Sequence, residues 1–404
     1  MGLSLESLSL SLAPALAQAQ AEHYRGALRK IPYGRQSINI SDVWALSSGL
    51  RSPWLTLGPA VEEFECKICG KTEASFAVAV SSGSAALDCA YAAIGLEPGD
   101  EVITTPMTFA STATTALNLG GKVMFADIQH KTGNIDPRSV EALISERTKA
   151  IVVVDYAGRP ADMEEIMAIG AKRGIPVIED GAYSLGSLYK GRPVGSIAYI
   201  TTFSFFPTKN ITTGEGGAVV TNNREFERKA RLFRSHGVVK DKQLLQKTSE
   251  GSWFQEVQSL GLNYRIPDLL ARLGISQLRP IDSFKKKRQE VFRHYEQFLG
   301  SNSGVVLPVW KPDADPMWHL FLIRVNAAHR RRIFDGLTDA GYLVQVNYFP
   351  VNSHPYFRSL GFVEDATPEA KRFYESEISL PIFSGLKKNS VRSISARLIQ
   401  LASE

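Results

Sequence analysis

The chain is predicted to be an α/β protein, in which a mainly parallel mixed sheet flanked by helices precedes a smaller α+β C-terminal domain. Short apolar runs alternate with helix-like stretches over the first two thirds of the 404 residues, a pattern typical of parallel strands joined by helical crossovers. The last third mixes long stretches of helical spacing with a few strands. We therefore expect a large domain at 30–269, a small domain at 270–404, and an N-terminal leader at 1–29 that packs against the small domain.

Composition is that of a soluble globular protein. Hydrophobic residues make up 44% of the chain and charged residues 22%, and the net charge is only +5. The two basic clusters, Lys285–Arg288 and Arg330–Arg332, lie in helix-like contexts, where a solvated helix face is the expected role. No nucleic-acid partner is therefore expected.

Three cysteines cannot build a disulfide framework, which indicates a reducing compartment. Cys66 and Cys69 form a C-x-x-C pair, but the run around them looks helical, and no second pair or nearby histidine completes a zinc site. We expect buried structural thiols and no metal.

The leader is rich in Ser, Leu and Ala, lacks a basic n-region and contains Glu6, so a secretory signal is not expected. No apolar run reaches the ~18–20 residues that a membrane span requires. The sequence therefore predicts a cytoplasmic protein without a membrane partner.

The expected elements follow in chain order. Ser41 is expected to cap a helix over 42–48, and a second helix follows the turn at Gly58-Pro59. Buried strands are expected at 76–80, 101–104, 122–126, 150–154, 175–178 and 218–220. Helical spacing then continues to Leu299, before a strand at 318–325, a helix at 329–342 and a strand at 344–348.

Residues with possible chemical roles follow three of these strands. The strand at 76–80 runs into Ser81-Ser82-Gly83-Ser84 and a helix, where free backbone N–H groups make a phosphate site unless this is a plain turn. Phe109 either packs in the core or lies flat on a planar ring. Asp180 either caps a turn or pairs with a protonated pyridine nitrogen.

Lys209 lies between an aromatic run and a glycine-rich turn, in FSFFPTKNITTGEGG. Aromatic neighbours would desolvate its ammonium group and free a neutral amine for nucleophilic attack, whereas a hairpin with a solvated lysine is the alternative. A phosphate-type turn, an aromatic shelf, a strand-end aspartate and such a lysine are together the parts that hold pyridoxal 5'-phosphate (PLP).

From about Ile31 onward, the chain also resembles the DegT/DnrJ/EryC1/StrS family of PLP-dependent sugar aminotransferases. The resemblance rests on motifs in the same order: LTLGPAVEEFE, SSGSAAL, PGDEVITTPMTFASTATT, VIEDGAYSLG, FSFFPTKNITTGEGGAVVT, RSHG and GLNYRIPDLLARLG. It implies the PLP-dependent transferase fold type I. The stretches IPYGRQSI, LTLGP and GYLVQVNYFPVNSHPYF most resemble the branch that acts on nucleotide-linked 4-keto-6-deoxy sugars, such as the UDP-4-amino-4,6-dideoxy-N-acetyl-altrosamine transaminases.

The resemblance implies roles for individual residues. Lys209 matches the lysine that forms a Schiff base with the cofactor and then moves the proton. Asp180 matches the carboxylate on the ring nitrogen, and Phe109 the aromatic side chain stacked on the ring. The residues implied around the phosphate are Gly83, Ser84, Ser204 and, reaching across from a second copy, Asn263 and Arg265. The resemblance therefore implies a homodimer with shared active sites.

Two positions depart from the family pattern. Relatives often carry His or Gln where this chain has Tyr183, and many carry His where it has Phe206. Tyr183 can still hydrogen-bond near the ring hydroxyl of the cofactor, whereas Phe206 cannot. The identity of the sugar therefore stays open. Sugar dehydratases of the family replace the lysine with histidine, so Lys209 favours transamination.

The expected activity transfers an amino group, with L-glutamate as the implied donor, to a keto group of a nucleotide-linked deoxysugar by a ping-pong mechanism. Candidate substrate contacts are Tyr33, His319, Tyr348 and His354, and a structural or surface role is the alternative for both histidines. Two other functions stay open: dehydration or epimerisation of a deoxysugar, and non-catalytic binding or regulation by the same fold.

Overall fold

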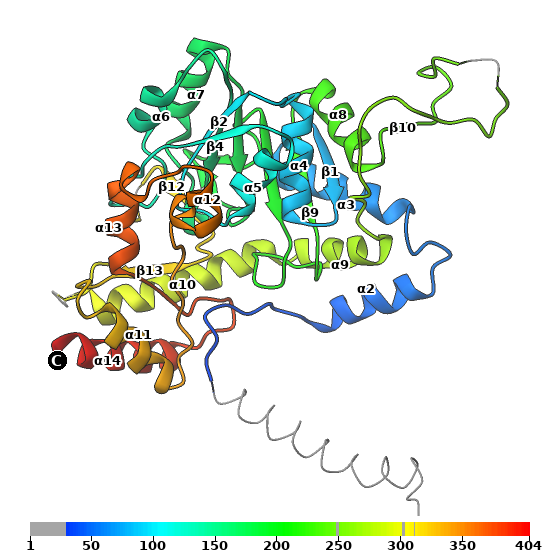
Figure 1. The fold of residues 1–404 in the computed structure, drawn as a ribbon. Helices are drawn as coiled ribbons and strands as arrows, with labels where there is room; N and C mark the ends of the chain where they lie inside the picture. Colours follow the sequence, from blue (N-terminus) through cyan, green and yellow to red (C-terminus); the bar gives the residue numbers. More distant parts are fainter. Residues whose placement is uncertain (1–29, 248–249, 301–303, 311) are drawn as a thin grey trace, which may run out of the picture.

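A seven-stranded sheet forms the centre of the computed structural model, which describes residues 30–247, 250–300, 304–310 and 312–404 (Figure 1). The predicted leader at 1–29 lies outside the described residues. In spatial order the strands are β1 (Phe76–Val80), β9 (Gly217–Thr221), β8 (Ile200–Ser204), β5 (Val177–Asp180), β4 (Thr148–Val154), β2 (Glu101–Thr104) and β3 (Lys122–Phe125).

The sheet is mixed but mainly parallel, which confirms the predicted class. Strand β9 runs antiparallel to its neighbours β1 and β8, and the successive pairs from β8 to β3 are parallel. The carboxyl ends of parallel strands meet at one edge of a sheet. Asp180, at the end of β5, and Ser204, at the end of β8, therefore lie at the same edge.

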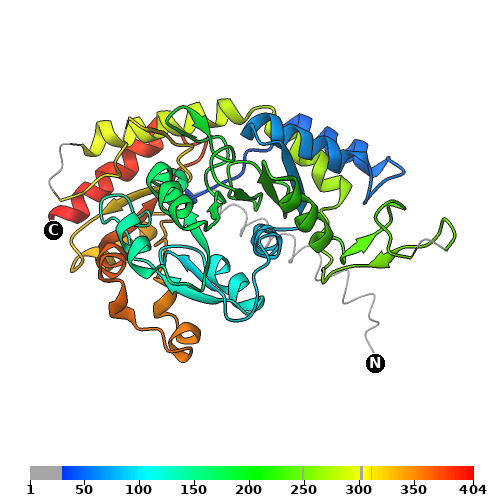
Figure 2. The same cartoon turned by 90° about the horizontal axis from the view of Figure 1, so that it is seen from above.

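Helices cover both faces of the sheet (Figure 2). Alternate side chains of a strand point to opposite faces, so Val78 and Val80 pack on one side and Ala77 and Ala79 on the other. The first face is covered by α4 (Gly83–Ala93), α5 (Ser111–Asn118) and α8 (Arg224–Arg234). The second is covered by α3 (Pro59–Thr72), α9 (Asp268–Leu278), α6 (Pro137–Leu143) and α7 (Met163–Arg173). Because both faces are buried, β1, β4 and β9 carry long apolar runs.

A second, smaller sheet pairs β13 (Phe321–Arg324) antiparallel with β14 (Glu377–Leu380). The helices around it are α10 (Ile281–Leu299), α11 (Arg330–Asp339) and α14 (Lys388–Ser403). Helix α10 belongs to both cores: Ile281 and Phe284 pack with the large sheet, and Phe292 and Tyr295 with the small one. The domain boundary at 269/270 stays a prediction.

The remaining elements are mostly short. They are α2 (Ile40–Leu50), η1 (Tyr156–Gly158), β6 (Leu188–Tyr189), β7 (Arg192–Pro193), β10 (Val238–Val239), β11 (Glu256–Val257), β12 (Ala314–Asp315), η2 (Val351–Ser353), α12 (Pro355–Ser359), η3 (Glu364–Ala366) and α13 (Pro368–Ser376). Strands β10 and β11 pair within an arm, residues 238–247 and 250–260, that stands away from the body of the protein (Figures 1 and 2).

Helix α2 begins one residue before the predicted cap. The side chain of Asn39 accepts hydrogen bonds from the backbone N–H groups of Ser41 (2.7 Å) and Asp42 (3.4 Å). The Asp42 carboxylate accepts one in return from the Asn39 N–H group, at 2.9 Å. This reciprocal capping box makes Asn39 the cap, so the prediction for Ser41 is wrong.

The predicted strand at 344–348 is reduced to a single antiparallel bridge, in which Gln345 pairs with Ser379 of β14. The backbone N–H of Asn347 donates to the carboxylate of Glu377, at 2.9 Å, rather than to a neighbouring strand. A backbone group that is satisfied by a buried side chain cannot join a sheet ladder.

The C-x-x-C pair lies in α3, as expected from its helical context. Cys69 is half-buried but Cys66 is exposed, so the prediction of buried thiols is wrong for Cys66. Among the described residues, no group of three or more His, Cys, Asp or Glu side chains is placed to hold a metal ion. No helix within the described ranges is long and apolar enough to cross a membrane.

Candidate active site

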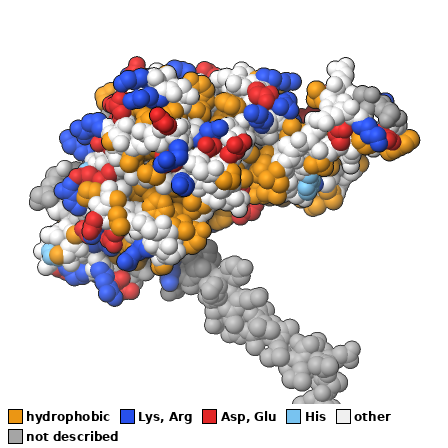
Figure 3. Space-filling view, turned by 45° about the horizontal axis from the view of Figure 1, so that its top comes forward, with side chains coloured by type: hydrophobic (Ala, Val, Ile, Leu, Met, Phe, Trp, Pro, Cys, Tyr) orange, Lys and Arg blue, Asp and Glu red, His pale blue; other side chains and the backbone are white. Residues whose placement is uncertain are grey.

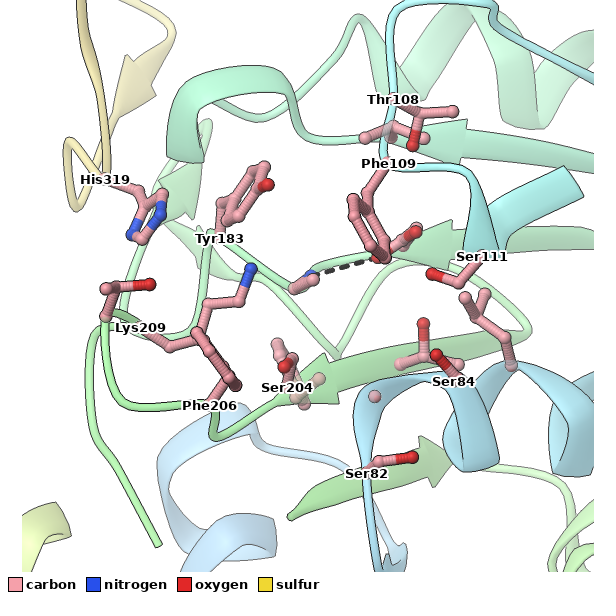
Figure 4. Close-up of a pocket in the computed structure, with 18 of the residues that line it drawn as sticks. Ser82, Ser84, Thr108, Phe109, Ser111, Tyr183, Ser204, Phe206, Lys209 and His319 are labelled. Carbon is pink, nitrogen blue, oxygen red and sulfur yellow. Dashed lines mark hydrogen bonds between the residues drawn. The ribbon is translucent and has the colours of Figure 1, made fainter. Parts of the chain in front are cut away.

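A cavity of about 350 Å³ opens at the sheet edge where β5 and β8 end, beside the N-terminus of α4 (Figure 4). Most of the predicted site residues line it: Tyr33, Gly83, Ser84, Phe109, Asp180, Tyr183, Ser204, Lys209, His319 and Tyr348. The strand ends of the large sheet supply one part of the lining. Segments that pack against the small sheet supply Tyr33, His319 and Tyr348.

Lys209 lies in a loop that hydrogen bonds close at its base. The N–H of Phe205 donates to the carbonyl of Gly216 at 2.8 Å, so the chain turns back directly from β8 into β9. The side-chain amide of Asn210 donates to the carbonyl of Tyr183 at 2.7 Å and ties the loop to the segment after β5. Sequence reasoning missed Asn210, although it directly follows the lysine.

The Lys209 side chain points into the cavity, toward Tyr183 (Figure 4). Its Nζ atom lies 3.8 Å from the centroid of the Tyr183 ring. Burial lowers the pKa of Lys209 from an ordinary value of 10.5 to about 7, although the negative charge of Asp180 opposes the shift. At pH 7 about half of the amines are therefore neutral, against about 3 in 10,000 for an ordinary lysine. A neutral amine is the form that attacks a carbonyl carbon.

Asp180 directs a buried carboxylate toward the cavity. One of its oxygens accepts a hydrogen bond from the hydroxyl of Thr112 (2.7 Å), and the other accepts one from the N–H of Ala182 (3.2 Å). Burial raises the pKa of Asp180, while these two bonds and the charge of Lys209 oppose the shift. A cationic ring nitrogen placed against this carboxylate would offset the cost of burying its charge.

Thr108 and Thr112, which support Asp180, were not predicted as site residues from the sequence. The hydroxyls of Thr108 and Thr112 lie 2.7 Å apart, so Thr108 supports the group that bonds the carboxylate. Their spacing of four residues, where the chain passes from a strand into a helix, could have indicated that the two hydroxyls lie side by side.

The N-terminus of α4 and the end of β8 form a cradle for an anion. The hydroxyl of Ser82 caps the helix by accepting from the N–H of Ala85, at 3.0 Å. Helix geometry leaves the N–H groups of Gly83 and Ser84 without an acceptor inside the helix. A Cβ atom on Gly83 would lie 2.8 Å from Cβ and 3.0 Å from Oγ of Ser204. Only glycine lets α4 approach Ser204 this closely, so the free N–H groups of the helix and the Ser204 hydroxyl lie at one place, as in a phosphate-binding site.

Two stacked rings form the wall beside Lys209. The rings of Tyr183 and His319 are nearly parallel, with centroids 4.3 Å apart and an interplanar angle of 7°. Burial lowers the pKa of His319 well below its ordinary value, and the charges of Lys209 and Arg288 add to the shift. The imidazole in this Tyr183–His319 stack is therefore neutral at pH 7.

Exposed aromatic side chains lie at the cavity as well. Phe109 is 58% exposed and meets Tyr348 edge to face, with centroids 6.2 Å apart. Phe206, which departs from the family pattern, is 45% exposed. Aromatic faces left open at a cavity are suited to cover a planar ligand.

Three predicted residues lie outside the cavity lining. Asn263 and Arg265 follow the arm, and the backbone of Arg265 pairs with Val80 at the end of β1. Their contact with the cofactor of a second copy stays a prediction. His354 lies edge to face against Phe349, with centroids 4.9 Å apart.

Sequence reasoning also missed the residues that hold Tyr348 in place. The hydroxyl of Tyr156 donates to the carbonyl of Asn347, and the N–H of Asn347 donates to Glu377. Burial raises the pKa of Glu377 to about 8. Tyr156 and Asn347 are 191 positions apart, so no local pattern connects them.

Comparison with known proteins places the chain in a family. Residues 37–399 match the model of the DegT/DnrJ/EryC1/StrS aminotransferase family. The spore coat polysaccharide biosynthesis protein SpsC of Bacillus subtilis is 37% identical over 370 residues, which are 90% of this chain and 95% of that protein. The UDP-4-amino-4,6-dideoxy-N-acetyl-beta-L-altrosamine transaminase of Campylobacter jejuni is 37% identical over 377 residues, 92% of this chain and 97% of that protein.

Solved structures are similar over nearly the whole chain. Helicobacter pylori PseC, an aminotransferase involved in the biosynthesis of pseudoaminic acid, has a TM-score of 0.87 at 32% identity and covers 93% of this chain and 99% of its own. The PLP-form of Spr1654 from Streptococcus pneumoniae has a TM-score of 0.87 at 28% identity, with 93% and 99% coverage. The chain therefore belongs to the DegT/DnrJ/EryC1/StrS aminotransferase family and is an enzyme of the PLP-dependent transferase fold type I.

Proposed function

We propose that this enzyme binds PLP and transfers an amino group from L-glutamate to a keto group of a nucleotide-linked deoxysugar by a ping-pong mechanism. One observation carries the proposal: the Lys209 amine and the Asp180 carboxylate share a cavity with the anion cradle at α4. The similarity to a transaminase named for a UDP-linked dideoxy sugar supports the substrate class.

The residues of the cavity fit PLP at several points. The N–H groups of Gly83 and Ser84 and the hydroxyl of Ser204 would hold the phosphate, and Phe109 would cover the ring. Asp180 would keep the ring nitrogen protonated. Bound PLP supplies an aldehyde carbon and an electron-withdrawing ring.

Lys209 would have two tasks. Its amine, half neutral near pH 7, would be the nucleophile for the aldehyde carbon of PLP, with the aldehyde oxygen leaving as water. With PLP and the donor bound, the Nζ atom of Lys209 would be placed to accept the proton from Cα of the amino acid. In the second half of the reaction, Nζ would deliver a proton to the sugar carbon that receives the amino group.

A second copy of the chain would complete the site. Large apolar side chains are exposed on α2, on the turn that follows it and on the arm: Ile40, Trp44, Trp54, Leu57, Trp253 and Leu260. Figure 3 shows hydrophobic side chains at the surface near the base of the arm. Such a surface supports a homodimer, in which Asn263 and Arg265 of each copy would reach the phosphate of the other.

The visible absorption spectrum tests the first half of the reaction. The yellow band of the purified protein with PLP should bleach when L-glutamate is added and return when a keto acid is added. A nucleotide-linked 4-keto-6-deoxy sugar in place of the keto acid should also restore the band. A band that ignores glutamate would favour another donor, dehydration, epimerisation or non-catalytic binding. No band after addition of PLP would overturn the proposal.

A further inference from the structure

Arg288 is a buried cation that the proposed mechanism does not use. It lies in α10, is 3% exposed, and makes no ion pair with a carboxylate among the described residues. Burial lowers its pKa to about 10. Arginine is rarely buried without an acidic partner, because its charge loses hydration. The hydrogen bonds that it makes to neutral groups therefore have to explain its position.

Arg288 holds two backbone carbonyls of the cavity wall. Its Nη1 atom donates to the carbonyl oxygens of Trp318 and Ile382, each at 3.2 Å. Trp318 directly precedes His319, and the N–H of Ile382 donates to the carbonyl of Tyr33 at 2.9 Å. His319 and Tyr33 both line the cavity. One guanidinium group therefore ties together two segments of the wall.

The backbone of Trp318 depends on such support. Its φ angle is +48°, in the left-handed region that a bulky residue occupies only when its surroundings hold it there. Phe292, one helical turn beyond Arg288, stacks on the indole ring with centroids 4.3 Å apart and an interplanar angle of 23°. Helix α10 therefore holds Trp318 by its carbonyl group and by its ring.

Further contacts lead from this residue to Lys209. The N–H of His319 donates to the carbonyl of Ala157 at 2.9 Å, and its ring stacks on Tyr183, which lies under Lys209. The packing leaves little slack: a Cβ atom on Gly158 would lie 2.7 Å from the carbonyl oxygen of Tyr183 and 2.9 Å from the nitrogen of His319. A shift of His319 would therefore reach Tyr183.

We propose that Arg288 is a positioning residue of this active site. By holding two carbonyls of the wall it fixes the Tyr183–His319 stack, which sets the place and the hydration of the Lys209 amine. The inference rests on the proposed function, in which that amine reacts. A purely structural Arg288 would stabilise the fold without changing the amine.

Arg288→Met removes the donors, and Lys285→Met is a matched control on the same helix. Lys285 donates to the carbonyl of Gly186 at 2.9 Å and pairs with Asp315 at 2.7 Å, outside the cavity lining. The measurement is the pH midpoint of reductive methylation of Lys209, in the full-length protein stripped of cofactor, read by mass spectrometry.

We expect Arg288→Met to raise this midpoint by about one pH unit or more, because water enters as the stack loosens and favours the charged amine. The groups that face the amine, Asp180, Tyr183 and His319, are unchanged in this variant. Lys285→Met should leave the midpoint where it is. An unchanged midpoint in folded Arg288→Met, or an equal shift in the control, would overturn the inference.

Two further measurements are planned. One replaces Arg288→Met if that variant does not fold, and the other tests whether the effect on Lys209 passes through His319. Arg288→Lys keeps a buried charge and one donor, and should shift the midpoint in the same direction by less. In a His319→Leu background, Arg288→Lys should cause no further shift of the methylation midpoint, because the contacts between Arg288 and Lys209 run through His319. Additive shifts of the midpoint would show that the effect does not pass through His319. The spectral response to glutamate is read separately. If the midpoints shift as expected but the spectrum does not respond to glutamate, the proposed function is rejected and the role of Arg288 is not. If the spectrum responds but the midpoints do not shift, only the role of Arg288 is rejected.

Discussion

Replacing Gly83 by alanine should weaken cofactor binding without unfolding the protein. The new Cβ atom would lie 2.8 Å from Cβ of Ser204, closer than two such atoms approach in proteins. Ser204 cannot retreat, because its Cβ has no rotamer freedom and β8 is paired with Gly217 of β9 at this position. Helix α4 must therefore move away from β8, so the phosphate loses contact with one side of the cradle. A hydrogen bond to a charged group contributes about 1.5–3 kcal/mol, which corresponds to a dissociation constant about 10- to 150-fold higher.

The assay is a titration of PLP into the stripped protein, followed by absorption, with thermal unfolding as a check of the fold. Gly70→Ala is the control, since a Cβ atom there would have nothing within 4 Å. Gly70 lies inside α3, so alanine should raise the free energy of unfolding by about 1 kcal/mol and leave PLP binding unchanged. A folded Gly83→Ala protein that binds PLP as tightly as the wild type would refute the cradle.

Other perturbations address the amine, the carboxylate and pH. Lys209→Ala should abolish turnover, because the group that bonds to the cofactor and moves the proton is lost; repeated turnover of glutamate by this variant would contradict the role. Asp180→Asn should retain cofactor but lose most of the wild-type kcat, since an amide does not hold the ring nitrogen protonated. Unchanged kcat would assign that task to another group. Because the pKa of Lys209 is lowered to about 7, the amine is protonated below that pH and neutral above it. The rate at which stripped protein captures PLP should therefore rise with pH and level off near pH 8, about one unit above the pKa. A rate that still climbs beyond about pH 10, as for an ordinary lysine, would show that the amine is solvated.

The class of fold and the reactive groups could be predicted from the amino-acid sequence. The predicted strands at 76–80 and 101–104 have the bounds of β1 and β2, because an apolar run buried on both faces needs no knowledge of its neighbours. Asp180 and Gly83 could be placed near one another because Asp180 ends β5, Gly83 follows β1, and both strands end at the same sheet edge. Strand β8 was not predicted, since its threonines and serine interrupt the apolar pattern that marks a buried strand.

How residues from distant parts of the chain complete the cavity could not be predicted from the sequence. The Tyr183–His319 stack and the support from Arg288 join elements far apart in the chain, and periodicity reports only on neighbours within one element. The predicted strand at 344–348, which pairs with β14 only at Gln345, shows the same limit. Its alternating pattern is compatible with a strand, but a ladder also needs free backbone groups, and Glu377 and Tyr156 take those of Asn347. Long-range packing and the pairing of buried polar groups are properties of the whole fold, so they become visible only when the chain is folded.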